Sequence, residues 1–182
     1  LHKIYSLNLK FNKFFKDYDF HNLYKELLNF CTVELSAFYF DIRKDVLYCD
    51  PKESKTRKST IIVLNIILES LLKWFAPILV FTTEEIYSLI NNKNESIHEN
   101  DFVKIPTNWK NDSLNQKWSE LFKIKQLANI SIEEKRISKE IGSSLEAEIK
   151  LNTNKEKFEL LNNLDLAEYF IVKKKKKKLS NK

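Results

Sequence analysis

The chain has 182 residues, of which 43% are hydrophobic, and a formal net charge of +6, so it is long enough for one domain, or for one domain and part of another, with a core of its own. It contains one Gly and three Pro, and this scarcity of turn residues favours long helices over a sheet of many hairpins. The single Gly excludes a Gly-rich phosphate-binding loop, and the two Cys have neither CxxC spacing nor a His pair at ligand spacing to form a metal site.

Several further classes are disfavoured by what the sequence lacks. The longest apolar run, Ile61 to Leu68, is interrupted by Asn65 and is too short to cross a membrane, and no signal-peptide pattern opens the chain. We therefore expect a reduced cytoplasmic protein with a buried thiol at Cys31 and an incidental one at Cys49. Because Met is absent altogether, we expect a fragment or a processed product.

The first expected elements are helical. Residues 1–17 carry apolar side chains among Lys and Asn and are expected to end a helix. From Tyr18 to Tyr48 no Gly or Pro intervenes, and Asp17 or Asp19 is placed to cap a second helix. Its apolar residues fall mostly at intervals of three or four, which predicts one long helix with a single apolar stripe: Phe20, Leu23, Leu27, Leu28, Cys31, Leu35, Phe38 and Ile42.

The same stretch carries a specific motif. It reads Leu-Ser-Ala-Phe-Tyr-Phe-Asp-Ile-Arg-Lys-Asp from Leu35 to Asp45, followed by Leu47 and Tyr48. This run resembles the end of a long helix in the anticodon-binding domain of the isoleucyl-tRNA synthetase family. Val46 is a departure, because the family usually has Arg there.

A polar, locally basic loop follows at residues 50–59. Its Arg-Lys-Ser at Arg57 to Ser59 resembles the family's Arg-Arg-Ser, although Ile61 replaces a usual Gln. Two interpretations stay open, solvated loop charge and contact with RNA phosphates. A largely apolar helix is expected over 58–76, and Pro77 should end it.

The next helix start is predicted at Thr82, where Glu85 would complete a capping box. The segments around Ala76-Pro77 and Phe81 to Ile86 also resemble the family. Residues 91–112 are polar and irregular, and the segment Ser-Ile-His ending at His98 resembles the family's Ser-Val-His. We expect His98 to be a loop side chain, and Trp109 to pack this loop onto the helices.

A long final helix is expected after a second capping box, Ser113 with Gln116, and Gly142 is placed as its C-terminal cap. Alternation from Leu145 to Leu151 predicts a half-buried strand. The run Ile-Gly-Ser-Ser-Leu-Glu-Ala from Ile141 to Ala147 is the most specific resemblance to the isoleucyl family.

Two more residues belong to this last match. The family's preceding Glu-x-x-Arg is matched by Glu133 and Arg136, whereas an earlier family Arg is Lys125 here. Together with Tyr-Asp-Phe-His from Tyr18 to His21, which also resembles the family, these matches cover residues 18–149. A short helix at 154–164 and a second strand at Tyr169 to Val172 resemble the start of the family's junction module.

Six consecutive lysines at residues 173–178 carry a charge equal to the formal net charge of +6, and the rest of the chain is close to neutral. A solvated, disordered tail is the default interpretation, and contact with RNA or with an acidic membrane surface is the alternative. The Cys-x-x-Cys zinc knuckle that follows in many bacterial members is absent from these 182 residues.

The fold class expected from all of this is mostly α, with an anticodon-binding helix bundle over 1–142 and the start of a small α/β junction module over 143–182. The resemblance implies a tRNA anticodon-arm binding domain that is itself not catalytic, because both ATP-binding signatures of the family are missing. The intact enzyme would join isoleucine to its tRNA with ATP and Mg²⁺ and edit valine, with zinc possible in a later module.

The implied partner is the isoleucine tRNA, bound by a cytoplasmic monomer without a membrane. The candidate RNA-binding residues lie in the basic loop and the final helix: Arg57, Lys58, Lys125, Arg136 and Lys139. Trp74 and Trp109 are possible stacking platforms, although burial at a helix end suits Trp74 better. Two alternatives stay open, a helical protein-interaction scaffold without RNA binding, and the equivalent domain of a valyl-, leucyl- or methionyl-tRNA synthetase.

Overall fold

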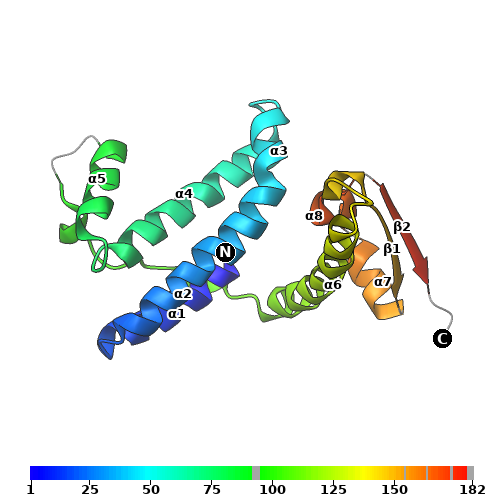
Figure 1. Cartoon of the computed structure of the whole chain (residues 1–182). Helices are drawn as coiled ribbons and strands as arrows, with labels where there is room; N and C mark the ends of the chain where they lie inside the picture. Colours follow the sequence, from blue (N-terminus) through cyan, green and yellow to red (C-terminus); the bar gives the residue numbers. More distant parts are fainter. Residues whose placement is uncertain (92–94, 154, 163, 173, 180–182) are drawn as a thin grey trace. The chain divides into compact units, whose positions relative to one another are not determined.

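The computed structural model describes residues 1–91, 95–153, 155–162, 164–172 and 174–179 (Figure 1). The chain divides into two compact units, Leu1–Asn111 and Asp112–Lys182, and each is treated by itself. This division precedes the final long helix, whereas the boundary expected from the sequence follows residue 142. The boundary after residue 142 is the expected junction between two modules of the family, and it stays a prediction.

Unit 1 is helical. Its elements in order are α1 (His2–Lys16), α2 (Phe20–Asn29), the π-helix η1 (Phe30–Phe40), α3 (Asp41–Cys49), α4 (Lys55–Phe75), α5 (Val80–Ile90) and the short 3-10 turns η2 (Ile97–Glu99) and η3 (Thr107–Trp109). In Figure 1, α2, η1 and α3 follow one another as one continuous helical rod, with α1 beside its first part.

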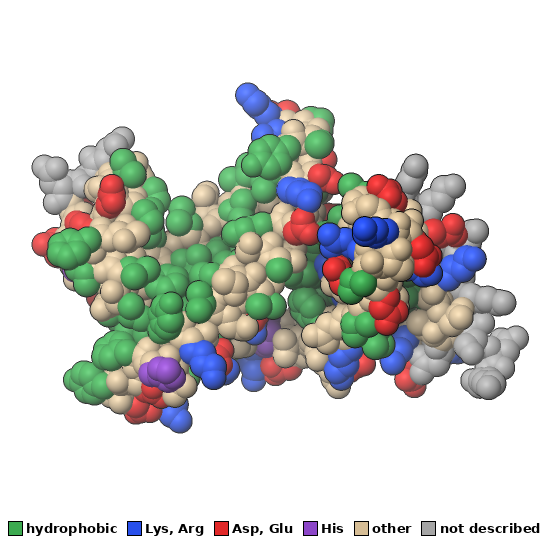
Figure 2. All heavy atoms as spheres, viewed as in Figure 1, with side chains coloured by type: hydrophobic (Ala, Val, Ile, Leu, Met, Phe, Trp, Pro, Cys, Tyr) green, Lys and Arg blue, Asp and Glu red, His purple; other side chains and the backbone are tan. Residues whose placement is uncertain are grey.

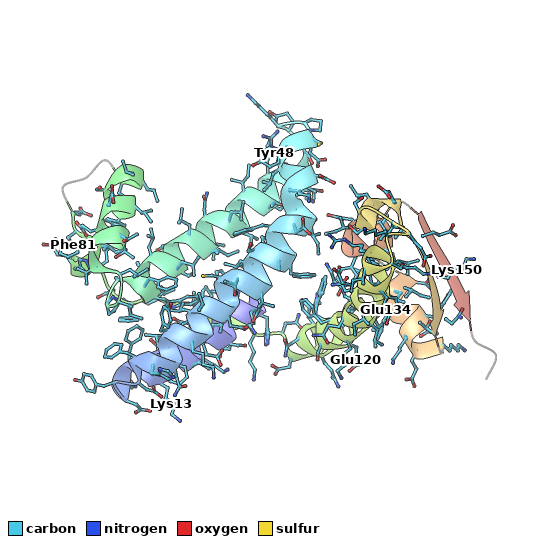
Figure 3. The ribbon with its side chains drawn as sticks, in the orientation of Figure 1. Lys13, Tyr48, Phe81, Glu120, Glu134 and Lys150 are labelled. Carbon is cyan, nitrogen blue, oxygen red and sulfur yellow. The ribbon has the colours of Figure 1, made fainter. Side chains whose placement is uncertain are left out.

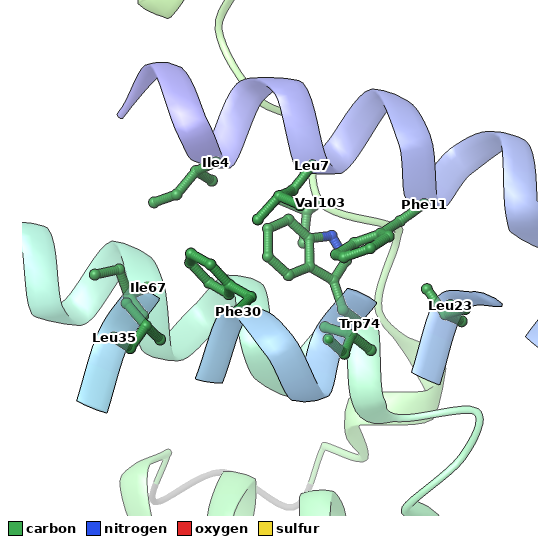
Figure 4. Close-up of a cluster of buried hydrophobic side chains, with 10 residues drawn as sticks. Ile4, Leu7, Phe11, Leu23, Phe30, Leu35, Ile67, Trp74 and Val103 are labelled. Atoms are coloured by element: carbon green, nitrogen blue, oxygen red, sulfur yellow. The ribbon is translucent and has the colours of Figure 1, made fainter. Parts of the chain in front are cut away.

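The core of unit 1 gathers side chains from α1, α2, η1, α4 and the segment at Val103 (Figure 4). Trp74 is at its centre, 0% exposed, with its ring edge-on to Phe11 at a centroid distance of 4.8 Å. The indole Nε1 donates to Asn8 Oδ1 at 3.1 Å, and Asn8 Nδ2 donates to the carbonyl of Val103 at 3.2 Å. This buried amide joins three segments and satisfies the polar groups that the core encloses. Trp74 is therefore a core residue and offers no face to RNA.

The α1–α2 turn shows how the second helix begins. Tyr18 adopts a left-handed backbone, with φ of 55°, and the amide of Asp19 donates back to Phe14 at 2.8 Å. Asp19 then caps α2 by accepting from the amide of Asn22 at 3.2 Å, as one of the two predicted caps. Hydrogen bonds from Asn22 hold the pKa of the Asp19 carboxyl below its usual value.

The predicted single α-helix from Tyr18 to Tyr48 is wrong in its middle third. Residues Phe30–Phe40 form a π-helix, which needs roughly four and a half residues per turn because its hydrogen bonds span five. The residues that face the core are accordingly separated by five and then by four positions. Phe30 and Leu35 are buried, and Tyr39 packs against the cluster. A stripe extrapolated at 3.6 residues per turn correctly included Leu35, but it predicted Cys31 and Phe38 where the structure uses Phe30 and Tyr39. Cys31 is half-buried, which raises the pKa of its thiol, and Cys49 is exposed.

The capping box predicted at Thr82 and Glu85 is also wrong, because α5 begins earlier, at Val80. The neighbouring Glu84 has a different role. Its Oε2 accepts from Ser96 Oγ at 2.8 Å and from the amide of Ile97 at 3.0 Å, and so holds the predicted Ser-Ile-His loop segment against α5. Trp109 packs against the core cluster of unit 1, which confirms its predicted place.

Unit 2 combines helices with a pair of strands. It contains α6 (Asp112–Ile137), the 3-10 turn η4 (Ser144–Glu146), β1 (Glu148–Thr153), α7 (Lys155–Asn162), α8 (Leu166–Phe170) and β2 (Lys174–Leu179). β1 pairs in parallel with β2, in a register that runs from Glu148 opposite Lys174 to Thr153 opposite Leu179. The two helices α7 and α8 form the connection that a parallel pair requires. The mostly α fold with a small α/β segment is confirmed.

Several expectations for unit 2 need correction. Tyr169 and Phe170 belong to α8 and not to a strand, and both are buried. The second strand lies in the lysine run that was expected to be a disordered tail; Lys173 itself is outside the described residues. Helix α6 begins at Asp112, so Ser113 is inside the helix and is not its cap.

Candidate nucleic-acid interface

The turn between α3 and α4 carries the first pair of predicted RNA contacts. This turn contains no Gly and is stabilised by hydrogen bonds from its own side chains. Ser54 Oγ donates to Asp50 Oδ2 at 2.7 Å, and Arg57 Nη1 donates to the carbonyl of Asp50 at 2.8 Å. Ser54 also caps α4 by accepting from the amide of Arg57 at 3.3 Å. The turn therefore has a defined shape that its own polar side chains maintain.

The structure places Arg57 and Lys58 next to each other but gives both of them intramolecular partners. Arg57 is half-buried and anchors the end of α3, whereas Lys58 Nζ is exposed and lies 2.5 Å from Glu53. An exposed ion pair of this kind contributes about 0–1 kcal/mol, so Lys58 can exchange Glu53 for a phosphate at little cost. Arg57 would lose a structural contact by doing so. Contact of either residue with RNA stays a prediction.

Three residues in and next to this turn were not among the named RNA-binding candidates, although Lys55 belongs to the basic loop for which phosphate contact was one of the two interpretations. Tyr48 is 86% exposed at the end of α3, and Lys52 and Lys55 are exposed on the turn and at the start of α4. A signal for Tyr48 was available, because the predicted apolar stripe stops at Ile42 and does not need this ring. The sequence contains no feature that distinguishes Lys52 and Lys55, as RNA-binding candidates, from the neighbouring Arg57 and Lys58.

The other predicted contacts lie in unit 2. Arg136 Nη1 is 3.0 Å from Glu133, and Lys135 Nζ is 2.6 Å from Glu140. The hydrogen bonds that Glu140 accepts, first from Lys135 and then from Ser138, lower the pKa of its carboxyl. Cations in this last turn of α6 also oppose the partial negative charge of a helix C-terminus. Arg136 and Lys139 line one shallow hollow together with Gly142, so the structure brings these two candidates together.

Lys139, and not Gly142, ends α6. Lys139 has φ of 58°, and its amide donates to the carbonyl of Arg136 at 3.0 Å. The amide of Glu140 donates to the carbonyl of Lys135, also at 3.0 Å. This hydrogen-bond pair is the Schellman pattern, with Lys139 in the left-handed position that Gly usually takes. Gly142 has no positive φ, so its predicted role as a cap is wrong.

Gly142 instead supports the turn of the Gly-Ser-Ser-Leu-Glu motif. Its amide donates to Glu146 Oε2 at 2.8 Å, and a Cβ at residue 142 would lie 3.2 Å from Glu146 Oε1. The motif therefore closes on itself through a backbone-to-carboxylate bond, which orients η4 before β1 begins.

We expect Lys139→Gly to raise the free energy of unfolding by about 1 kcal/mol, because a left-handed backbone is costly for a residue with a Cβ and free of that cost for Gly. Lys139→Ala is the matched control, since it removes the same charge and keeps the strained backbone. Urea unfolding followed by circular dichroism measures both. Equal effects of the two variants would show that charge, and not backbone strain, determines stability here.

Lys125 occupies a different environment from the other candidates. It is 8% exposed, and its Nζ lies 5.2 Å from the centroid of the Tyr169 ring. Its stem and ammonium are thus enclosed in unit 2 between α6 and α8. Contact of Lys125 with RNA stays a prediction, and the burial of this side chain favours a packing role.

An apolar surface covers parts of α4 and α5 (Figure 2). The exposed apolar side chains of these two helices include Phe81 at 90%, Leu89 at 77% and Ile62 at 60%. Such side chains offer no charge to a phosphate backbone, and they lie outside both the basic turn before α4 and the end of α6. No described helix is both long and apolar enough to span a membrane, and the described residues hold no group of three or more His, Cys, Asp and Glu side chains suited to a metal ion.

Comparisons with known proteins agree with this description. The family "Anticodon-binding domain of tRNA ligase" matches residues 1–151. The chain is 63% identical to the isoleucine–tRNA ligase of Pelagibacter ubique over 172 residues, which cover 94% of the chain and 19% of that relative. It is 41% identical to the same ligase of Bartonella henselae over 173 residues, covering 94% and 18%, and 42% identical to that of Agrobacterium fabrum over 147 residues, covering 81% and 15%. The chain thus spans less than a fifth of the length of these relatives.

Proposed function

This chain belongs to the anticodon-binding domain family of the tRNA ligases, and from that membership we propose that it binds the anticodon arm of the isoleucine tRNA as part of an isoleucine–tRNA ligase. The observation that carries the choice of tRNA is the identity of 63% to a protein described as an isoleucine–tRNA ligase. The motif from Ile141 to Ala147 supports it, as does the basic turn before α4.

The proposal extends to the longer protein. Such a ligase would join isoleucine to its tRNA with ATP and Mg²⁺ and would edit valine, as a cytoplasmic monomer that needs no membrane. We assign these reactions, and any zinc module, to other parts of the ligase. The present chain supplies RNA binding.

Binding of an anticodon arm makes two physical demands on this chain. Cations must replace the counterions of the stem phosphates, and this release makes affinity depend steeply on salt. Flat side chains must also receive bases that leave the loop stack, since RNA sequence is read mostly in single-stranded loops. The α3–α4 turn carries exposed cations and is preceded in the sequence by the exposed ring of Tyr48, and the end of α6 offers Arg136 and Lys139.

We expect the chain to bind isoleucine tRNA more tightly than a non-cognate tRNA. If about five cations meet phosphates, raising the salt from about 50 to about 200 mM should weaken binding about 100-fold. Filter binding or fluorescence anisotropy across a salt series measures both quantities. Lys58→Ala should reduce affinity and the salt slope, and Arg57→Ala should in addition lower stability because it removes the brace to Asp50.

Equal and weak affinity for both tRNAs would contradict the proposed specificity. Affinity without salt dependence would contradict the electrostatic mode of binding. Absence of any binding would favour the scaffold alternative, for which the exposed apolar surface of α4 and α5 is the supporting feature.

A further inference from the structure

The ring of Tyr48 lies in solvent at the end of α3, at the extremity of the helical rod in Figure 3. It is 86% exposed, and none of the residues of α3 is buried. Exposure alone assigns no role, because single exposed apolar side chains are common on protein surfaces. Phe81, for example, is 90% exposed on α5. Tyr48 differs from Phe81 because exposed lysines follow it in the sequence.

Two lysines lie within seven residues of this ring, Lys52 in the turn and Lys55 at the first position of α4. Both are exposed, and no ion pair involves either of them within the described residues. The adjacent Arg57 and Lys58 bind Asp50 and Glu53. Arg57 and Lys58 therefore have partners within the protein, and Lys58 would have to exchange its exposed pair with Glu53 for a phosphate. Lys52 and Lys55 are available to a ligand without such an exchange.

The backbone that carries these side chains is held in place before any ligand arrives. Asp50 accepts from both Ser54 and Arg57, and the amide of Ser54 donates to the carbonyl of Pro51 at 2.9 Å. A side chain presented from a fixed backbone loses less conformational freedom on binding than one presented from a flexible loop. This favours a recognition role over incidental exposure.

We propose that Tyr48 is the platform on which an unpaired base of the anticodon loop stacks, and that Lys52 and Lys55 contact the phosphates beside that base. Arg57 acts as a positioning residue, through its bond to Asp50. The ligand is thus a single-stranded RNA loop, because only an unpaired base exposes a face to the ring while its backbone reaches the two ammonium groups. This inference rests on the proposed function and adds the residues that carry it.

The ring is tested with the full 182-residue chain and a synthetic anticodon stem-loop of the isoleucine tRNA that carries 2-aminopurine in the loop. We expect Tyr48→Ala to weaken binding about tenfold, within the range measured for loss of one base–aromatic stack, and to abolish the fluorescence quenching that stacking produces. Tyr48→Phe keeps the ring and should keep both. Phe81→Ala, which removes an equally exposed ring elsewhere, should change neither.

The lysines are tested by the salt slope. Lys52→Ala with Lys55→Ala should lower the slope of log affinity against log salt by about 1.5, as expected for two lost phosphate contacts. The matched control is Lys13→Ala with Lys16→Ala, two exposed lysines of α1, which should leave the slope unchanged. Because all four side chains are exposed, the variants should fold like the wild type, as far-UV circular dichroism will show.

The outcomes separate this inference from the proposed function. Salt-dependent binding by the wild type that Tyr48→Ala leaves unchanged would overturn the inference and leave the proposed function standing. An equal loss in Tyr48→Phe would overturn the stacking role, because the ring is retained. A wild-type chain that binds no tRNA even at low salt would overturn the proposed function and this inference together.

Discussion

Replacement of Trp74 by alanine should lower the free energy of unfolding by about 3–5 kcal/mol, the usual cost of deleting a large aromatic side chain from a core. The indole is 0% exposed and contacts the rings of Phe11 and Phe30, at centroid distances of 4.8 and 6.4 Å. Its loss would leave a cavity among α1, α2 and α4. Urea unfolding followed by far-UV circular dichroism measures the effect without relying on tryptophan emission.

Trp74→Phe divides this effect into packing and hydrogen bonding. The smaller ring fills part of the space but cannot donate to Asn8 Oδ1, which stays buried. An unsatisfied buried acceptor costs about 1–3 kcal/mol, so this variant should still be clearly destabilised. Asn8 also donates to Val103, and its rotation toward another partner would disturb that bond.

The matched control is Phe81→Ala, because Phe81 is 90% exposed and its removal should change stability by less than about 0.5 kcal/mol. Equal effects of the Trp74 and Phe81 variants would contradict the core described for unit 1. A large effect of Trp74→Ala on tRNA affinity in folded protein would contradict the conclusion that this ring is not a platform.

The helical character of the chain was predictable, because scarce Gly and the apolar periodicity are local properties of the sequence. The π-helix was not, since it depends on a choice between two hydrogen-bond spacings that the same residues permit. Phe30, Leu35 and Tyr39 form a core face only with the wider turn. A tertiary preference thus overrides the default period in the middle of the rod.

The helix end at Lys139 illustrates a second kind of limit. Sequence rules placed the left-handed position at the one Gly of the chain, because Gly pays nothing for it. The structure places that conformation at Lys139 and uses Gly142 for close approach to a carboxylate. Likewise, the sequence located a basic turn before α4, but only the hydrogen bonds show which of its cations are already engaged.

The prediction of disorder for the lysine run was wrong for a different reason. Like charges repel, so the run was expected to be disordered. Its strand forms by backbone pairing with β1, and backbone hydrogen bonds do not depend on which side chains a strand carries. A strand of lysines therefore has no hydrophobic alternation for a sequence pattern to detect.

Stability should also fall at high pH because of one phenol in unit 2. Burial raises the pKa of Tyr169 to about 12, whereas in an unfolded chain a tyrosine titrates near 10. Between these values the unfolded chain loses the proton while the folded one keeps it, so the folded state binds more protons and becomes less stable as pH rises. The stabilising contribution is complete below about pH 10 and is lost on the way to about pH 12.

The expected loss is about 2 kcal/mol between about pH 9 and about pH 12, from a difference of about two pKa units. Lys125 lies beside the ring, so the contribution of the phenol has to be separated from that of its neighbours. Tyr169→Phe isolates the phenol, because it keeps the contacts of the ring with Trp118 and Phe170 and removes the proton. The wild type should lose about 2 kcal/mol more than this variant over the same interval.

Tyr48→Phe provides the comparison for this measurement, since it deletes the same hydroxyl from an exposed ring. Urea unfolding at each pH gives the three stability curves. Parallel curves for the wild type and Tyr169→Phe would show that this phenol is as accessible to solvent in the folded chain as in the unfolded one. That result would contradict the packing of α8 against α6, in which the ring of Tyr169 is buried and lies near Trp118 and the ammonium group of Lys125.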